Sequence, residues 1–104
     1  ETDGFDSSDM WQRAMIGHSA QNQIPVVASN RIGTEQGLDN SNYFYGRSFI
    51  TNHIGDKIAE AGRDLEEVLI GEIDLKEAET LRNVWGIFRD RRPDLYSNLM
   101  TVDG

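Results

Sequence analysis

The chain has 104 residues, 38% of them hydrophobic, which allows one domain or part of one with a small core. Its formal net charge of −8 argues against non-specific binding to nucleic acid or to an anionic membrane, and no apolar run approaches a membrane span. Without cysteine, these residues offer no disulfide, thiolate metal site or cysteine nucleophile, and two distant histidines do not make a zinc or iron site. Because residues 1–4 also lack a signal-peptide pattern, we expect a cytoplasmic protein without metal or cofactor.

The first predicted helix opens at residues 6–9, where polar side chains suit an N-terminal cap, and it ends at residues 22–23. Its buried face is predicted from helical spacing to consist of Trp11, Ala14, Met15 and His18. Gln12 falls outside this stripe. We interpret His18 as a packing residue with a hydrogen bond, and not as a catalytic base.

A short apolar run at residues 24–28 follows almost at once and then changes abruptly to Ser29, Asn30 and Arg31. The run predicts a strand that is buried on both faces. The polar end of such a strand commonly presents functional groups, here hydrogen-bond donors and a guanidinium. The alternative is a turn in which Asn30 bonds the local backbone.

Residues 34–42 are polar and rich in turn formers, so we expect a loop there. Residues 43–51 are rich in aromatic and β-branched side chains and predict a strand, in which Gly46 marks a bulge or a close backbone approach. A turn at residues 52–56 and a strand at residues 57–61 complete a hairpin.

A further strand is predicted at residues 67–73, and Asp74 with Glu77 begins a second helix as a capping-box-like pair. The inner side of this helix is expected to consist of Leu75, Ala78, Leu81 and Trp85. Gly86 is its expected stop, and the charge-dense residues 87–104, broken by a proline, are expected to form an extended arm. The result is an α/β (α+β) layer of helices on a sheet, with open edges and an uncovered face that need a second half or a partner.

Three groups of residues allow either a functional or a structural interpretation. Glu1, Asp3 and Asp6 would form an anionic mouth for a cationic substrate, or a solvated loop and helix cap. The aromatic residues 43–45 would line a pocket or belong to the core. The basic cluster at residues 89–92 would bind phosphate or be ion-paired within the arm, and its interleaved acid favours the second.

Four segments resemble the carbon–nitrogen hydrolases of the nitrilase superfamily, and together they span essentially the whole chain. They are DGFDSSDMWQR with a following GH at residues 3–18, PVVASNRIG at residues 25–33, FYGRSFI at residues 44–50 and WGIFRDRRPDLY at residues 85–96. The last segment is the most specific. Within the superfamily, the likeness is greatest to the amidases that act on N-carbamoylputrescine.

The resemblance implies a four-layer α-β-β-α sandwich, longer than this chain, of which residues 1–104 would be the C-terminal part and residues 87–104 an arm. It also implies a Glu–Lys–Cys mechanism. The thiolate attacks the carbonyl, the glutamate transfers protons and the lysine stabilises the tetrahedral intermediate. In the family these three groups lie upstream of the matched segments. We therefore expect no catalytic residue in this chain, and no activity from it alone.

The resemblance also favours particular residues for binding. In the family, the strand that ends at Ala28, Ser29 and Asn30 lies beside the nucleophile, which implies that these three form a wall of the substrate pocket. Glu1 and Asp3 would lie near the mouth, where their charge suits an ammonium tail. The family's terminal arm reaches across subunits, which implies a homo-oligomer formed through Arg89, Arg91, Arg92 and Tyr96.

The implied reaction is hydrolysis of a small carbamoyl amine, N-carbamoylputrescine, to putrescine, ammonia and carbon dioxide. One alternative is the same chemistry on N-carbamoyl amino acids or β-ureido acids, whose carboxylate would require an arginine in the pocket. The other is a non-catalytic, truncated module that pairs with other subunits.

Overall fold

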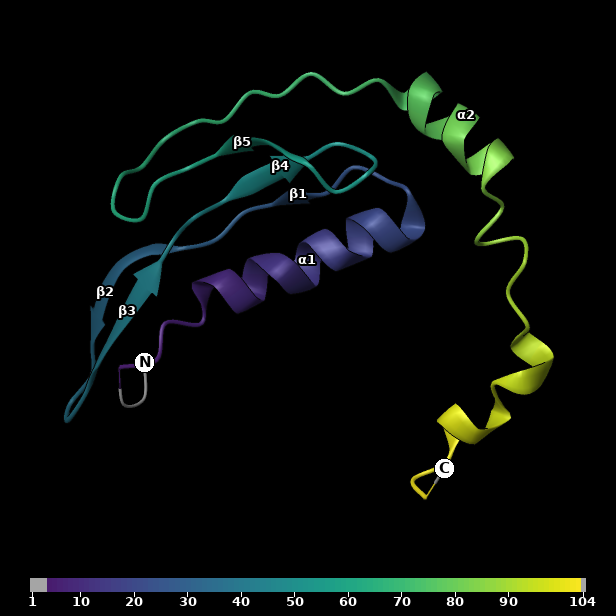
Figure 1. Ribbon diagram of the computed structural model, residues 1–104. Helices are drawn as coiled ribbons and strands as arrows, with labels where there is room; N and C mark the ends of the chain where they lie inside the picture. The colour runs from purple at the N-terminus through teal and green to yellow at the C-terminus, as the bar shows by residue number, and fades with distance from the viewer. Residues whose placement is uncertain (1–3, 104) are drawn as a thin grey trace.

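The computed structural model describes residues 4–103 and forms a mixed α/β layer (Figure 1). The elements in chain order are α1 (Ser8–Asn22), β1 (Val27–Ala28), β2 (Ile32–Gln36), β3 (Ser41–Tyr45), β4 (Phe49–Thr51), β5 (Lys57–Glu60), α2 (Leu75–Val84) and the 3-10 turns η1 (Pro93–Leu95) and η2 (Ser97–Met100). Among the described residues, no helix is both long enough and apolar enough to cross a bilayer.

The strands form two antiparallel sheets. The first has the order β1-β4-β5, in which Ala28 pairs with Phe49 and Ile50 pairs with Ala59. The second is the β2–β3 hairpin, closed by a hydrogen bond from the Gly37 amide to the Asn40 carbonyl (2.7 Å). This hairpin occupies most of residues 34–42, so the predicted loop is wrong. The polar sequence there reflects a hairpin exposed on both faces and not an absence of strand pairing.

Helix α1 covers one face of the first sheet. Trp11 packs edge-on against the fully buried Phe49, with ring centroids 5.5 Å apart and planes at 86°. Ala28 is also buried, whereas its neighbour Val27 is 70% exposed. The prediction of a strand buried on both faces is therefore wrong. β1 is an edge strand, and only one of its faces is covered within the described chain.

The buried face of α1 is largely polar, and this corrects the predicted stripe. Ala14 and His18 are exposed, while Ser8, Gln12 and Ser19 are buried. The Ser19 hydroxyl donates to the Ile24 carbonyl (2.7 Å) and lies 2.8 Å from the hydroxyl oxygen of Thr51 on β4. Hydrogen-bond partners on the sheet, and not apolar spacing, thus determine which side of the helix faces inward.

Gln12 is the centre of this contact between α1 and the sheet, and it is 3% exposed. Its Nε2 donates to the Arg47 carbonyl and to Glu60 Oε1, both at 3.1 Å. Its Oε1 accepts from Arg47 Nη2 (2.9 Å) and Lys57 Nζ (3.1 Å). Both donors and both acceptor positions of the carboxamide are therefore occupied.

The chain after β5 returns along the other side of the sheet from α1, as Figure 1 shows. The predicted strand at residues 67–73 is not formed, because this segment pairs with no described strand and meets side chains of β4 and β5 instead. Val68 and Ile70 are 87% and 89% exposed. Gly71 lies close to Ile50, and a Cβ atom there would be 3.2 Å from Ile50 Cδ1.

Helix α2 begins as predicted. The Asp74 carboxylate accepts from the amides of Lys76 (2.9 Å) and Glu77 (3.1 Å), which caps the first turn. The predicted inner side is confirmed at Ala78, which is buried, but Leu75 and Trp85 are exposed. Beyond α2 the chain forms the turns η1 and η2 and is less extended than expected.

The described unit is open and flat. Its principal extents are 50 × 43 × 17 Å, and its radius of gyration is 17.9 Å. A compact domain of this length would have a radius of gyration of about 13 Å. The thin shape and the exposed apolar residues after β5 agree with the expectation of a sheet whose second face is uncovered.

We expect Gln12→Met to lower the free energy of unfolding by about 1–3 kcal/mol, because Arg47, Lys57 and Glu60 would lose a partner at a buried site. Urea unfolding of the protein expressed from its complete reading frame measures this loss. The matched control Gln21→Met, at an exposed position of α1, is expected to change the value by less than about 0.5 kcal/mol. Equal losses in the two variants would contradict the role given to Gln12.

Candidate functional site

The predicted wall residues lie together in a groove of about 270 Å³ at the end of β1. Ala28, Ser29 and Asn30 form one side of it. Ser48, residues 61–62 and residues 65–67, which include Glu66 and Glu67, also line the groove. The three residues that the family resemblance favoured thus share one concave surface. Glu66 and Glu67 were not predicted, because they lie 36 or more positions away along the chain.

Asn30 is held firmly in this groove. Its amide donates to Ser48 Oγ (2.8 Å), and its Nδ2 donates to the Gly46 carbonyl (3.0 Å). Its Oδ1 accepts from the Arg31 amide (2.9 Å), so the local-backbone alternative is confirmed for that atom. Ser29 is exposed, and none of the described residues hydrogen-bonds its hydroxyl. Ser29 is therefore the wall residue with hydrogen-bonding capacity left for a ligand.

Arg31 does not line the groove. Its Nη1 forms an ion pair with Glu35 (2.8 Å), and its guanidinium lies over the Phe44 ring, 4.2 Å from the centroid. The aromatic run at residues 43–45 also lies outside the groove. Tyr45 instead packs near Trp11, with centroids 6.0 Å apart. The core interpretation of these aromatic residues is nevertheless not confirmed, because Tyr43 is exposed and the other two are only half-buried.

Of the three acidic residues predicted at the mouth, Glu1 and Asp3 lie outside the described residues. Asp6 acts as a helix cap. Its Oδ1 accepts from the Ser8 amide (2.9 Å), and its Oδ2 pairs with Arg63 Nη2 (2.7 Å). The hydrogen bonds from Ser8, assisted by Arg63, lower the pKa of Asp6 from 3.8 to about 2. The cap alternative is thus confirmed for this residue.

A charged cluster beside this cap was not predicted from the sequence. Arg47 bonds Asp9 and Glu60, and Lys57 Nζ bonds Glu60 Oε2 (2.6 Å). Hydrogen bonds lower the pKa of both acids, chiefly from Arg47 for Asp9 and from Lys57 for Glu60. The available signal was a lone arginine directly after Gly46 in an otherwise aromatic and β-branched run, which is unusual for a strand.

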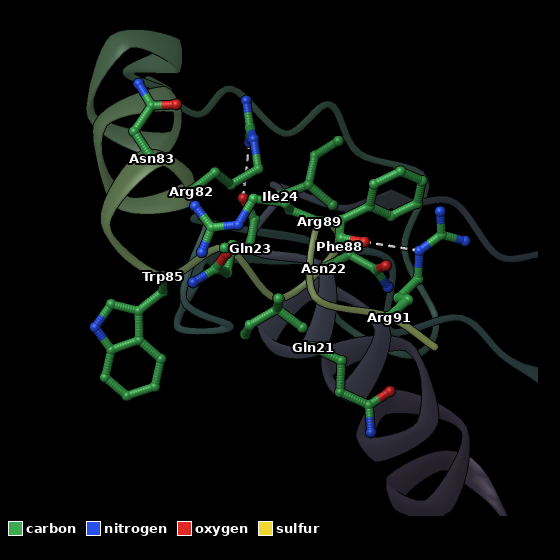
Figure 2. Close-up of a pocket in the computed structure, with 12 residues that line it drawn as sticks. Gln21, Asn22, Gln23, Ile24, Arg82, Asn83, Trp85, Phe88, Arg89 and Arg91 are labelled. Atoms are coloured by element: carbon green, nitrogen blue, oxygen red, sulfur yellow. Dashed lines mark hydrogen bonds between the residues drawn. The ribbon is translucent and has the colours of Figure 1, made fainter. Parts of the chain in front are cut away.

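A larger cavity of about 520 Å³ lies between the end of α1 and residues 82–91 (Figure 2). Arg82 Nη1 donates to the Gln23 carbonyl (2.9 Å) at the C-terminal end of α1. Arg91 stacks on Phe88, 3.6 Å from the ring centroid. This cavity contains none of the predicted wall residues, so we regard the smaller groove as the candidate site.

Two of the three arginines in the basic cluster of the arm are ion-paired, as the structural interpretation expected, whereas Arg91 Nε donates to the Phe88 carbonyl (2.8 Å). Arg89 pairs with Asp90 and Arg92 pairs with Asp94, each at 2.8 Å. The Tyr96 hydroxyl accepts from the Arg92 amide (3.1 Å). Across residues 4–103, there is no group of three or more histidine, aspartate or glutamate side chains that could hold a metal ion.

The low pKa of Asp6 predicts a pH-dependent stability. A carboxylate whose pKa is lowered by folding stabilises the fold above its ordinary pKa, and this contribution is lost between about pH 4 and about pH 2. We expect Asp6→Asn to lower the urea midpoint at about pH 7 and the difference from the unsubstituted protein to narrow below about pH 4. Asp39→Asn, in the exposed hairpin turn, is the control with the same change of charge. If the urea midpoints of Asp6→Asn and of the unsubstituted protein differed by the same amount at every pH, the prediction would be contradicted.

Comparison with known proteins matches residues 6–83 to the family described as carbon-nitrogen hydrolase. A citrullinase from Francisella tularensis is 51% identical over 92% of this chain and 34% of its own length. An N-carbamoylputrescine amidase from Solanum tuberosum is 48% identical over 100% of this chain and 36% of its own length. The crystal structure of a carbon-nitrogen hydrolase from Helicobacter pylori G27 superposes with a TM-score of 0.83 at 34% identity, over 92% of this chain and 34% of that chain.

The chain therefore spans about a third of the length of the relatives that it matches. The family model covers most of the chain, and the fold agrees with a solved member. The expected resemblance, including the likeness to N-carbamoylputrescine amidases, is confirmed. This chain belongs to the carbon–nitrogen hydrolase family.

Proposed function

We propose that this chain is part of an enzyme that hydrolyses the carbamoyl group of a small amine such as N-carbamoylputrescine. One water is consumed, the C–N bonds of the carbamoyl group break, and the products are the free diamine, ammonia and carbon dioxide. Family membership supports the reaction class. The 48% identity to an N-carbamoylputrescine amidase over the whole chain supports the substrate class.

The groups that would carry out this reaction lie outside these residues. The family resemblance implies a Glu–Lys–Cys triad, and this chain has no cysteine. The role proposed for the chain is therefore substrate binding through Ala28, Ser29 and Asn30, with Glu1 and Asp3 at the mouth. We further propose that residues 1–104 are the C-terminal part of a four-layer α-β-β-α sandwich, whose remaining layers cover the exposed apolar residues after β5.

The observation that carries the substrate class is the charge of the groove. Its ionisable lining residues are Glu66 and Glu67, and no arginine or lysine of the described chain lines it. A carboxylate-bearing substrate would require a cationic partner, and a paired arginine would be the usual one. An ammonium tail is instead attracted by two carboxylates. This supports a carbamoyl diamine over an N-carbamoyl amino acid or a β-ureido acid.

Citrulline is the second candidate substrate, because the citrullinase is 51% identical. Citrulline and N-carbamoylputrescine share a terminal carbamoyl group and an ammonium group on an aliphatic chain. They differ in the carboxylate that citrulline carries beside its ammonium. The two carboxylates of the groove would attract the ammonium group that both molecules carry. They would repel the carboxylate that only citrulline carries.

For the arm at residues 87–104, we propose a role in forming a homo-oligomer through Arg89, Arg91, Arg92 and Tyr96. Leu99 and Met100 of this arm are highly exposed, and they would be buried by a second subunit. A non-catalytic module that only pairs with other subunits remains the alternative from a different class. Intact-mass measurement of the natural protein distinguishes the two, because the enzyme must include an upstream cysteine.

We expect the protein expressed from its complete reading frame to release ammonia from N-carbamoylputrescine with a kcat/KM at least about tenfold higher than for citrulline or N-carbamoyl-β-alanine. Ammonia and diamine are measured in parallel, since hydrolysis releases them in equal amounts. A preference for either carboxylate-bearing substrate would contradict the proposed substrate class. No turnover of any carbamoyl compound would favour the non-catalytic module.

The double substitution Glu66→Gln with Glu67→Gln tests the role of the groove charge. We expect KM for N-carbamoylputrescine to rise about tenfold, with KM for the neutral analogue N-butylurea nearly unchanged, because only the charged tail loses an electrostatic partner. Glu72→Gln with Glu79→Gln removes the same charge outside the groove and serves as the control. Equal effects on the charged and the neutral substrate would contradict this role.

A further inference from the structure

The link between β3 and β4 has an unusual backbone at Arg47. Gly46 and Arg47 are consecutive residues with positive φ, +61° and +59°. Among the described non-glycine residues, Arg47 shares such a φ only with Gln23. A side chain with a Cβ atom disfavours this left-handed conformation, so contacts elsewhere must hold Arg47 in it.

The guanidinium of Arg47 provides those contacts. Nη1 donates to Ser8 Oγ (2.8 Å) and to Asp9, Nη2 donates to Gln12 Oε1, and Nε donates to Glu60 Oε1 (3.2 Å). Four of its N–H groups are thus engaged, and the side chain is 15% exposed. Three of the four acceptors lie on the first turns of α1. Arg47 therefore has little capacity left for a ligand and acts as a fixed connection.

The same link holds the wall of the groove from its other side. The Gly46 carbonyl accepts from Asn30 Nδ2, Ser48 Oγ accepts from the Asn30 amide, and the Gly46 amide donates to the Arg31 carbonyl (2.9 Å). A continuous set of hydrogen bonds therefore runs from the first turns of α1, through residues 46–48, to Asn30. In Figure 1 the start of α1 lies beside the passage from β3 to β4.

We infer that Arg47 is a positioning residue that fixes the start of α1, and the segment leading into it, relative to the groove wall at Asn30. This inference rests on the proposed function, in which Glu1 and Asp3 belong to the mouth and Asn30 belongs to the wall. Arg47 touches neither the substrate nor the reacting atoms. It sets the relative position of two elements that are proposed to bind the substrate.

Arg47→Gly tests this inference, because glycine adopts the positive φ freely and lacks the guanidinium. In the protein from the complete reading frame, we expect KM for N-carbamoylputrescine to rise about tenfold and kcat to stay within about twofold, since the displaced elements are proposed to bind the substrate and Arg47 does not contact the reacting atoms. Arg47→Lys is expected to give an intermediate KM, because one ammonium cannot bridge α1 and Glu60 together. Arg13→Ala, on the exposed side of α1, loses the same charge and should leave KM unchanged.

A second readout needs no turnover. Amide hydrogen exchange of Arg47→Gly is expected to be faster in both residues 4–12 and residues 28–36, and unchanged in residues 75–84. Faster exchange in residues 4–12 alone, or an unchanged KM in the folded variant, would overturn the inference. If Arg47→Gly does not fold, the Arg47→Lys variant is measured in its place. A KM and amide exchange rates equal to those of the unsubstituted protein would then overturn the inference. If the unsubstituted protein hydrolyses no carbamoyl amine, the proposed function fails, and the exchange result alone decides whether Arg47 couples the two elements.

Discussion

The carboxamide of Gln12 joins α1 to the sheet, and the arrangement of the whole layer depends on it. Both of its donors and both of its acceptor positions are used, by partners on β5 and on the link between β3 and β4. Within the described residues, no buried side-chain polar atom lacks a hydrogen-bond partner. A satisfied polar contact of this kind is more specific in geometry than an apolar one, because a small rotation of the helix would leave several buried groups unpaired.

This polar contact explains how so flat a unit keeps a defined shape. Few apolar side chains are fully buried, and Phe49 against Trp11 is the main apolar contact beneath the sheet. The rest of the attachment of α1 comes from Ser19 near its end and from Ser8, Gln12 and the charged cluster near its start. The opposite face of the sheet remains partly uncovered, which agrees with a chain that spans about a third of its relatives' length.

The candidate groove lies at the edge of the same framework. Its wall at Asn30 is bonded to residues 46 and 48, and residue 47 is bonded to α1. Site and fold are therefore supported by one set of hydrogen bonds. The exposed residues of the groove, Ser29, Glu66 and Glu67, are left with surfaces that a ligand can reach.

The sequence by itself determined the features that depend on neighbouring residues. The start and end of α1, the cap at Asp74 and the strand that became β5 follow from side chains only a few positions apart. The close approach predicted at Gly46 is present as well, since a Cβ atom there would lie 3.0 Å from the Gly62 carbonyl. The motifs were long enough to identify the family, and the resemblance in turn led to the prediction of a pocket wall at Ala28, Ser29 and Asn30.

Tertiary structure decided the features that depend on distant partners. Apolar spacing predicted Ala14 and His18 on the buried side of α1, but Gln12 is buried instead because Arg47 and Glu60, 35 and 48 positions away, bind it. Residues 67–73 have the composition of a strand and form none, because a strand needs backbone pairing and this segment meets β4 and β5 through their side chains instead. Periodicity records which residues are apolar. It does not record which polar groups will form hydrogen bonds with distant residues. In this layer, those hydrogen bonds set both the rotation of α1 and the position of Asn30.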